Sequence, residues 1–195
     1  VFVCVCVRVH IHACVFVCAR TLVCVHVCVH VCDICGICVL FVLQVIGVDI
    51  GVQKLSKNSI PVLVEKCLTF IEANGMDSEG LYRVSGRKAS MAKLKASFQS
   101  NASQVIIDTE VYSVHDVTGV LKDYFRNLPD PLFTSLHYKR LTAAAEISDH
   151  NEKLCALRDC ICELPPVNYY TLKKMIGHLV CITENEVVTK MGISN

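Results

Sequence analysis

Hydrophobic residues follow two different periods along the chain. Valine occupies nearly every odd position from Val1 to Val31, with cysteine, histidine, phenylalanine or arginine between. From Gly47 onward the apolar residues recur every three or four positions, which is the spacing of one face of an α-helix. We therefore divide the chain into residues 1–46, a low-complexity segment rich in Val, Cys and His, and residues 47–195, a helical domain.

The clearest helical pattern lies in residues 58–75. Asn58 or Ser59 is expected to cap this helix, because their side chains accept hydrogen bonds from a first helical turn. Pro61 suits that first turn, and Gly75 suits the end of the helix. The apolar positions of its buried stripe are Ile60, Leu63, Val64, Cys67, Leu68 and Ile71.

The same period predicts further helices. One covers residues 88–100, and another begins at Ser113-x-x-Asp116, a pattern in which two side chains cap one helix start. The latter helix stops before Pro129, because proline cannot continue it. The remaining expected helices are Ser135 to Ile147, Asn151 to Leu164 and Asn168 to Ile182, the last capped by Asn168. No strand pattern competes with them, so the predicted class is all-α, with the helices packed around one core.

The first 46 residues have the period of a β-strand, because valine is β-branched and alternate side chains share one face. The pattern is nevertheless too uniform for a natural strand. A repeated TG dinucleotide read in triplets gives alternating Val and Cys codons, and Arg and Phe codons lie one base away from the Cys codon. We therefore interpret this segment as translated simple-sequence DNA.

Membrane interpretations of the same segment are weaker. A transmembrane helix needs about 20 largely apolar residues, and Arg8, Arg20 and Asp33 interrupt the run. A signal peptide would need a basic flank and a small-residue cleavage site around one apolar core, and neither is present. The chain starts without methionine, as a fragment does. Any membrane contact is expected only through residues 1–46 or through further domains of a longer protein.

A metal site is the other alternative for this segment. Its candidate ligands are Cys24, His26, Cys28, His30 and Cys32, with Cys35 and Cys38 following at x2 spacing. Neighbours on one face of a strand lie about 7 Å apart, which is too far for one tetrahedral ion. No fourth cysteine follows Cys38 at cluster spacing. We therefore predict no metal site, and a metal protein with a helical appendix stays the weakest interpretation.

Composition narrows the function classes. A length of 195 residues suits one ordinary domain, and a net charge of +1 gives no reason to expect nucleic acid as a partner. Nine of the 14 cysteines lie in residues 1–46. The other five fall mostly on apolar helix faces and are expected to be buried thiols in a reducing compartment. They are Cys67, Cys155, Cys160, Cys162 and Cys181.

Two cations stand one turn apart on the helix that follows Ser113. Lys122 and Arg126 are i, i+4 neighbours, a spacing that is mildly destabilising for like charges unless an anion lies between them. One interpretation is a solvated face in which Asp123 and Asp130 are the partners. The other is a surface prepared for a binding partner. The sequence contains no Ser-His-Asp spacing, HExxH motif or P-loop that would indicate a hydrolase.

Arg83 lies in "DSEGLYRVSGR", between Gly80 and Gly86. This stretch resembles the arginine-finger loop of the Rho-family GTPase-activating (RhoGAP) domain. Three later stretches resemble that family in the same order, over about 150 residues in all. They are "VTGVLKDYFRNLPDPLF", "KLCALRDCICELPPVNYYTLKKMIGHL" and "TKMGISN".

The resemblance implies a RhoGAP-like helical bundle that docks on a GTP-bound Rho-family small GTPase and stimulates GTP hydrolysis. By motif position Arg83 would be the catalytic finger, acting in trans. Lys122 and Arg126 would support the finger loop and contact the GTPase, and Asn195 would match an interface asparagine. The domain would need no cofactor, would not itself be an enzyme, and would act in the cytoplasm, recruited to membranes by other parts of a longer protein.

Two departures from the family pattern bear on activity. Thr189 replaces the asparagine that usually precedes Lys190-Met191, and the apolar helix that should follow Asn195 is expected to be missing. Loss of a packed helix would expose core surface. The stabilisation lost with it can exceed the whole marginal stability of a domain, about 5 to 15 kcal/mol. The alternative function is therefore a GAP-like module that binds a GTPase without stimulating it. The sequence does not indicate which GTPase would be preferred.

Overall fold

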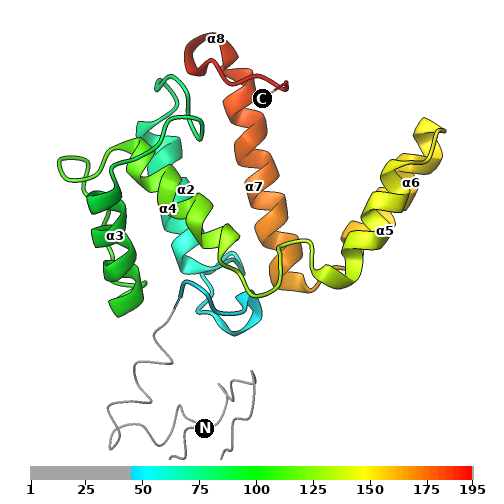
Figure 1. The fold of residues 1–195 in the computed structure, drawn as a ribbon, viewed down its shortest axis with the longest axis horizontal. Helices are drawn as coiled ribbons and strands as arrows, with labels where there is room; N and C mark the ends of the chain where they lie inside the picture. Colours follow the sequence, from blue (N-terminus) through cyan, green and yellow to red (C-terminus); the bar gives the residue numbers. More distant parts are fainter. Residues whose placement is uncertain (1–44, 195) are drawn as a thin grey trace, which may run out of the picture. The chain divides into compact units, whose positions relative to one another are not determined.

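The computed structural model describes residues 45–194, and within them it contains helices and no named strand. Figure 1 shows the helices in chain order. The elements are η2 (Ile50–Val52), α2 (Val62–Asn74), α3 (Lys88–Asn101), α4 (Val114–Arg126), α5 (Ser135–Ala145), α6 (His150–Cys162), α7 (Pro166–Glu184) and α8 (Glu186–Thr189). The prediction of an all-α class is confirmed. The metal candidates between Cys24 and Cys38, and Asn195, lie outside the described residues.

The start of α4 matches the predicted capping box. The Ser113 hydroxyl accepts a hydrogen bond from the Asp116 backbone N–H at 3.2 Å, and the Asp116 carboxylate accepts one from the Ser113 N–H at 3.0 Å. Two N–H groups without a partner inside the helix are thereby satisfied. The helix ends at Arg126, ahead of Pro129, as predicted.

Two predicted caps are wrong, and proline is the reason in both. Helix α2 begins after Pro61, which is itself the N-cap residue, and neither Asn58 nor Ser59 caps it by a side chain. Helix α7 begins at Pro166, since proline is preorganised for a first helical position. Asn168 consequently lies inside the first turn, where its buried amide donates to the Leu132 carbonyl at 2.9 Å and ties the preceding loop to α7.

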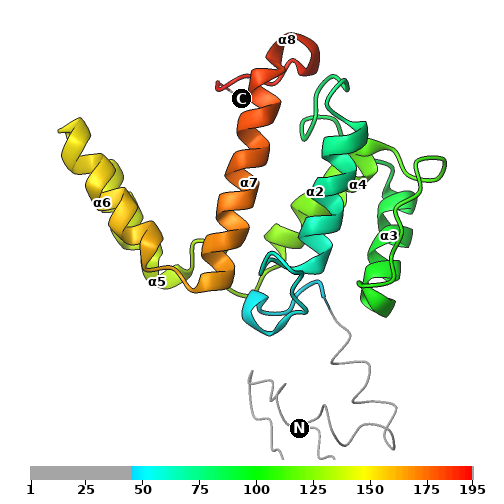
Figure 2. The ribbon, with the colours of Figure 1, turned by 180° about the vertical axis from the view of Figure 1, so that it is seen from behind.

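Helices α2 and α4 pack together at the centre of the core, with α3 against α4 and α7 against α2. Figure 2 shows this group from behind, with α5 and α6 forming a separate antiparallel pair beyond α7. Tyr124 of α4 is fully buried, and its hydroxyl donates to Gln53 Oε1 at 2.9 Å. The largest fully buried apolar side chains besides it are Phe98, Ile60, Leu63, Leu68, Ile71, Leu81, Leu94 and Leu121.

The cysteine prediction is only partly right. Cys67 and Cys160 are buried, whereas Cys155, Cys162 and Cys181 are exposed, and all five are free thiols. A neighbouring helix covers only one side of each helix. Where the apolar stripe is wider than that contact, the apolar side chains at its edges stay exposed. Helix α7 is an example, with Ile176 and Val180 each about half exposed.

No helix among residues 45–194 has the length and apolar character needed to cross a bilayer.

The helical unit begins at Val45, two residues before the expected boundary at Gly47. The Val45 N–H donates to Gln99 Oε1 of α3 at 2.9 Å, and both Val45 and Ile46 pack against the core. These two residues belong with the helical unit. We propose that the boundary between the low-complexity segment and the helical domain follows Gln44.

We predict that deletion of residues 1–44 leaves the thermal unfolding of the helical domain unchanged, because the sequence gives that segment no helical pattern. Deletion of residues 1–46 should lower the free energy of unfolding by about 1 to 2 kcal/mol, through one lost hydrogen bond and lost apolar contact. Circular dichroism melts of both variants and the full chain measure this. A large loss of melting temperature already in the shorter deletion would show that residues 1–44 pack on the domain.

Candidate functional site

Arg83 lies in the loop that joins α2 to α3, residues 75–87. Its side chain is 55% exposed, and its guanidinium lies 3.9 Å from the Glu79 carboxylate, a weak surface pair. Figure 1 shows this loop beside α8. The guanidinium is therefore accessible to a partner, and releasing it from Glu79 costs little.

The backbone around Arg83 forms a tight turn. The N–H groups of Arg83 and Val84 both donate to the Gly80 carbonyl, each at 2.9 Å. Gly80 has φ +71°, a left-handed conformation that glycine adopts without steric cost, and a Cβ there would lie 2.8 Å from Val84 Cγ2. Tyr82 has φ +63° although it is not glycine. Such a conformation costs about 1 to 3 kcal/mol and persists only where surrounding contacts impose it.

Other elements hold this turn in place. The Gly80 N–H donates to the Thr189 carbonyl of α8 at 2.7 Å, and Lys122 Nζ of α4 donates to the Tyr82 carbonyl at 2.5 Å. Near the end of the loop, a Cβ on Gly86 would lie 2.5 Å from the His115 carbonyl oxygen, so only glycine lets the loop approach α4 this closely. The glycines on either side of Arg83 thus serve a turn and a close approach.

Arg87 and Asp116 join the end of the loop to the start of α4. The buried Asp116 carboxylate accepts hydrogen bonds from the Arg87 backbone N–H at 2.6 Å and from Arg87 Nη2 at 2.8 Å. Burial alone would raise the pKa of Asp116, but the hydrogen bonds from Arg87 and Ser113 outweigh it and lower the pKa to about 2. The group is therefore ionised at neutral pH, when it makes all of these bonds.

Tyr82 also reaches α7. Its hydroxyl lies 2.9 Å from His178 Nε2, and the opposite ring nitrogen of His178, Nδ1, lies 3.2 Å from Glu72 Oε1 of α2. Sequence reasoning missed Tyr82, His178 and Glu72, and it singled out Thr189 only as a departure from the family pattern, not for its contact with the loop. A histidine on the apolar stripe of the last long helix was the one available signal, since a buried imidazole needs partners.

The predicted site residues are placed as follows. Lys122 touches the loop that carries Arg83, so the interpretation of Lys122 as only a solvated side chain is wrong. Arg126 lies one turn further along α4 with its side chain 76% exposed, and its nearest acid is Asp123 at 3.8 Å. Asn195 lies outside the described residues. The structure thus places Lys122 against the loop that carries Arg83 and leaves Arg126 open to solvent.

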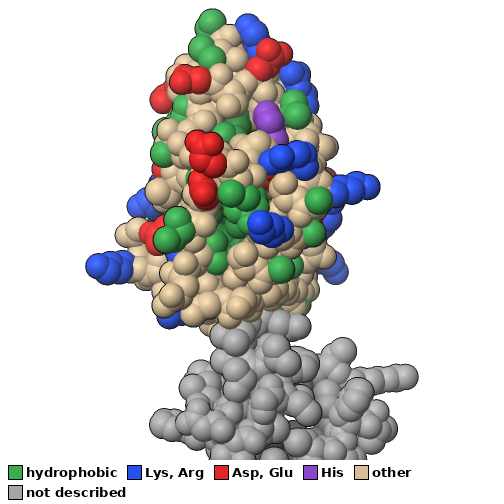
Figure 3. Space-filling model, turned by 90° about the vertical axis from the view of Figure 1, so that its left-hand side faces the viewer, with side chains coloured by type: hydrophobic (Ala, Val, Ile, Leu, Met, Phe, Trp, Pro, Cys, Tyr) green, Lys and Arg blue, Asp and Glu red, His purple; other side chains and the backbone are tan. Residues whose placement is uncertain are grey.

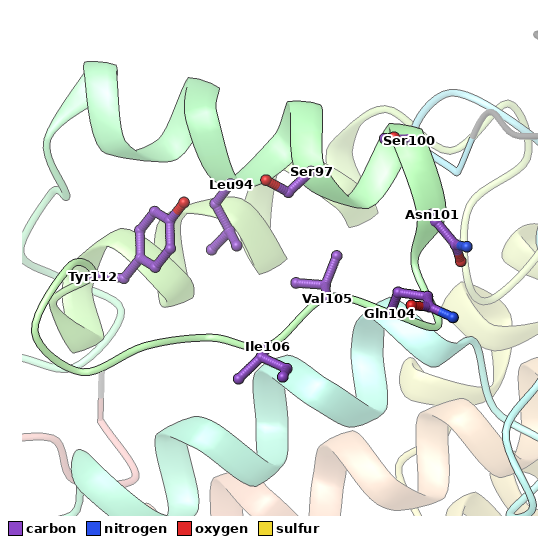
Figure 4. A pocket seen from close by; sticks show the side chains of 8 residues that line it. All are labelled: Leu94, Ser97, Ser100, Asn101, Gln104, Val105, Ile106 and Tyr112. Atoms are coloured by element: carbon purple, nitrogen blue, oxygen red, sulfur yellow. The ribbon is translucent and has the colours of Figure 1, made fainter.

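The rest of the described surface gives no comparable indication of a functional site. A shallow pocket of about 390 Å³ lies between α3 and the segment that follows it, and Figure 4 shows its lining. Those residues are Leu94, Ser97, Ser100, Asn101, Gln104, Val105, Ile106 and Tyr112; none is charged or belongs to the Arg83 loop. Figure 3 shows acidic and basic side chains interspersed on the face it presents. In residues 45–194 no three His, Cys, Asp or Glu side chains are grouped to hold a metal.

Comparison with known proteins identifies the family of the helical domain. Residues 61–195 match the family model described as the RhoGAP domain. The chain belongs to the RhoGAP family. The matched range contains all of α2 to α8 and the whole Arg83 loop.

Two curated relatives and one solved structure show how similar this RhoGAP domain is to known proteins. It is 38% identical to mouse beta-chimaerin over 69% of this chain and 41% of that protein. It is 36% identical to the human breakpoint cluster region protein over 77% of this chain and 12% of that protein. Human Rho GTPase activating protein 15 superposes with a TM-score of 0.68 at 32% identity, covering 76% of this chain and 71% of that one. The chain thus spans less than half the length of beta-chimaerin and of the breakpoint cluster region protein.

The departure at Thr189 leaves the loop contact intact. The Thr189 hydroxyl donates to the Asn185 carbonyl at 3.0 Å and accepts from the Met191 N–H at 3.3 Å, so the side chain fixes its own turn. The contact to Gly80 uses the Thr189 backbone carbonyl. A change of side chain at this position therefore keeps the hydrogen bond to the loop.

We predict that Asp116→Asn lowers the free energy of unfolding by about 2 kcal/mol at pH 7. The pKa of Asp116 is lowered from 3.8 to about 2 on folding, so the carboxylate stabilises the folded state at pH values above the unfolded pKa. That contribution is lost as the pH falls through the folded pKa. The difference between variant and wild type should accordingly shrink between about pH 5 and pH 2.

Urea unfolding across that pH range measures the effect. Glu110→Gln, which also neutralises one carboxylate but at an exposed loop position, is the control and should change stability little at any pH. An Asp116→Asn deficit that stayed constant from pH 7 to pH 2 would contradict this account.

Proposed function

We propose that this RhoGAP domain stimulates GTP hydrolysis by a Rho-family small GTPase and that Arg83 is the finger supplied in trans. The observation that carries the proposal is the exposed guanidinium of Arg83 on a turn that α4, α7 and α8 all hold. Several relatives are named as Rho GTPase-activating proteins, which supports the partner class. The domain completes the partner's active site and brings no cofactor.

The chemistry explains why the residue is arginine. In GTP hydrolysis negative charge spreads over phosphoryl oxygens in the transition state, and fixed donors aimed at that charge lower the barrier. The planar guanidinium presents several donors in a rigid fork, so it can contact a phosphate oxygen and a neighbouring carbonyl together. The partner must therefore be in its GTP-bound form when Arg83 acts.

Lys122 and Arg126 take different parts in this proposal. Lys122 supports the loop through the Tyr82 carbonyl, so its charge serves the position of Arg83. Arg126 is exposed and weakly paired, which leaves it free to contact the GTPase. By family position Asn195 belongs to the same interface. The free thiols of the described residues suit the reducing cytoplasm, where we place the activity.

Arg83→Ala should reduce the stimulated hydrolysis rate by about 10³-fold or more, because arginine fingers contribute that much to kcat. Binding to the GTP-loaded partner should change by at most about threefold, since an interaction made only in the transition state adds little to ground-state association. Arg83→Lys should restore little, because an ammonium lacks the planar fork. Single-turnover hydrolysis, titrated with each 195-residue variant over a panel of Rho-family GTPases, gives both quantities.

Arg158→Ala, which removes an exposed arginine on α6, is the matched control and should keep the wild-type rate. If Arg83→Ala also kept most of that rate, the finger assignment would be wrong. If the wild-type chain bound a GTPase without accelerating hydrolysis, the alternative of a pure binding module would replace this proposal.

A further inference from the structure

Tyr82 immediately precedes Arg83 and has the unfavourable positive φ of the turn. The direction in which the Arg83 side chain leaves the loop is set by this backbone conformation, because the next two N–H groups bond back to Gly80. Something must therefore hold Tyr82 in place against its backbone preference. Its carbonyl is held by Lys122, which leaves the side chain to be explained.

The side chain of Tyr82 points at a buried polar group on α7. Its hydroxyl lies 2.9 Å from His178 Nε2, and the two rings meet edge to face with centroids 5.9 Å apart. His178 has a side chain with no exposed surface. Burial of a polar imidazole costs free energy unless it is hydrogen-bonded. The contact between His178 and the residue that precedes Arg83 therefore needs an explanation.

Glu72 orients that histidine. Its carboxylate lies 3.2 Å from His178 Nδ1 and is also bound by Lys174 Nζ at 3.0 Å. Burial lowers the pKa of His178, with the hydrogen bond to Glu72 acting in the opposite direction, so the neutral imidazole is favoured near neutral pH. Burial also raises the pKa of Tyr82, which keeps its hydroxyl protonated.

These groups fix the direction of each hydrogen bond. A carboxylate only accepts, so the proton of neutral His178 lies on Nδ1 and is donated to Glu72. Nε2 is then an acceptor, and the Tyr82 hydroxyl donates to it. Both hydrogen bonds are therefore donated in the same direction. The Tyr82 hydroxyl of the loop donates to His178 of α7, and His178 donates to Glu72 of α2.

We propose that Tyr82, His178 and Glu72 form a positioning relay that holds the Arg83 turn in the conformation needed for catalysis. The inference rests on the proposed GTPase-activating function. The relay touches neither nucleotide nor GTPase in this account; it acts through the backbone of Arg83. The loop then need not be ordered between docking of the GTPase and the transition state, so the relay acts on the rate and not on the affinity.

The test is Tyr82→Phe against a matched control. Tyr124→Phe also removes one buried tyrosine hydroxyl that makes a single hydrogen bond at 2.9 Å, to Gln53 and not to the loop. Both variants should lose similar melting temperature. Only Tyr82→Phe should lower the stimulated single-turnover rate at saturating chain, by roughly tenfold, the change that a loss of about 1.4 kcal/mol produces. The half-saturating concentration should move less than about threefold.

A second measurement does not depend on activity. Amide hydrogen exchange of residues 80–87 in the free 195-residue chain should become roughly tenfold faster in Tyr82→Phe and stay unchanged in Tyr124→Phe. Glu72→Ala should also speed exchange, whereas Glu72→Gln, which keeps an oxygen acceptor for His178, should restore most of the protection.

The outcomes separate the two claims. A wild-type chain that stimulates no GTPase, while Tyr82→Phe still loosens residues 80–87, overturns the proposed function and with it the catalytic part of the relay, but leaves the loop contact standing. Equal exchange in Tyr82→Phe and Tyr124→Phe overturns the relay itself. Equal saturating rates in the two variants, with stimulation by wild type intact, do the same.

Discussion

The carboxylate of Asp116 is the contact on which the rest of the site depends. It caps α4 through Ser113, and it also receives the backbone and side-chain N–H groups of Arg87. One buried charge thereby joins the end of the Arg83 loop, the start of α3 and the start of α4. An ionised group of this kind is costly to bury without partners, so the three segments are stable together and each is much less stable alone.

A fixed loop end changes what the exposed part of the loop can do. Residues 80–84 turn between that point and further contacts from α4, α7 and α8, so Arg83 projects from a frame that the fold has already ordered. A catalytic side chain that acts on another protein gains from such order, because the entropy of fixing the loop is lost during folding and not on reaching the transition state. This explains why polar groups such as His178 lie in an otherwise apolar helix packing.

The sequence predicted what depends on neighbours in the chain and missed what depends on distant ones. The period of 3.6 residues located the helices, and the Ser113 and Asp116 spacing located the capping box. Asn168 looked like a cap but serves a loop 36 residues away, because Pro166 had already started the helix. The Tyr82 and His178 pair spans 96 residues, and the acceptor for Lys122 is a backbone carbonyl, which no residue type reveals.

The central claim is that Arg83 contributes to the transition state and not to ground-state binding. Titration calorimetry of the chain with a GDP-loaded Rho-family GTPase, with and without aluminium fluoride as a mimic of the transferred phosphoryl group, tests it directly. We expect aluminium fluoride to tighten binding by about 100-fold or more for the wild type, as transition-state analogues do. We expect no such gain for Arg83→Ala. Equal tightening for both proteins would contradict the account.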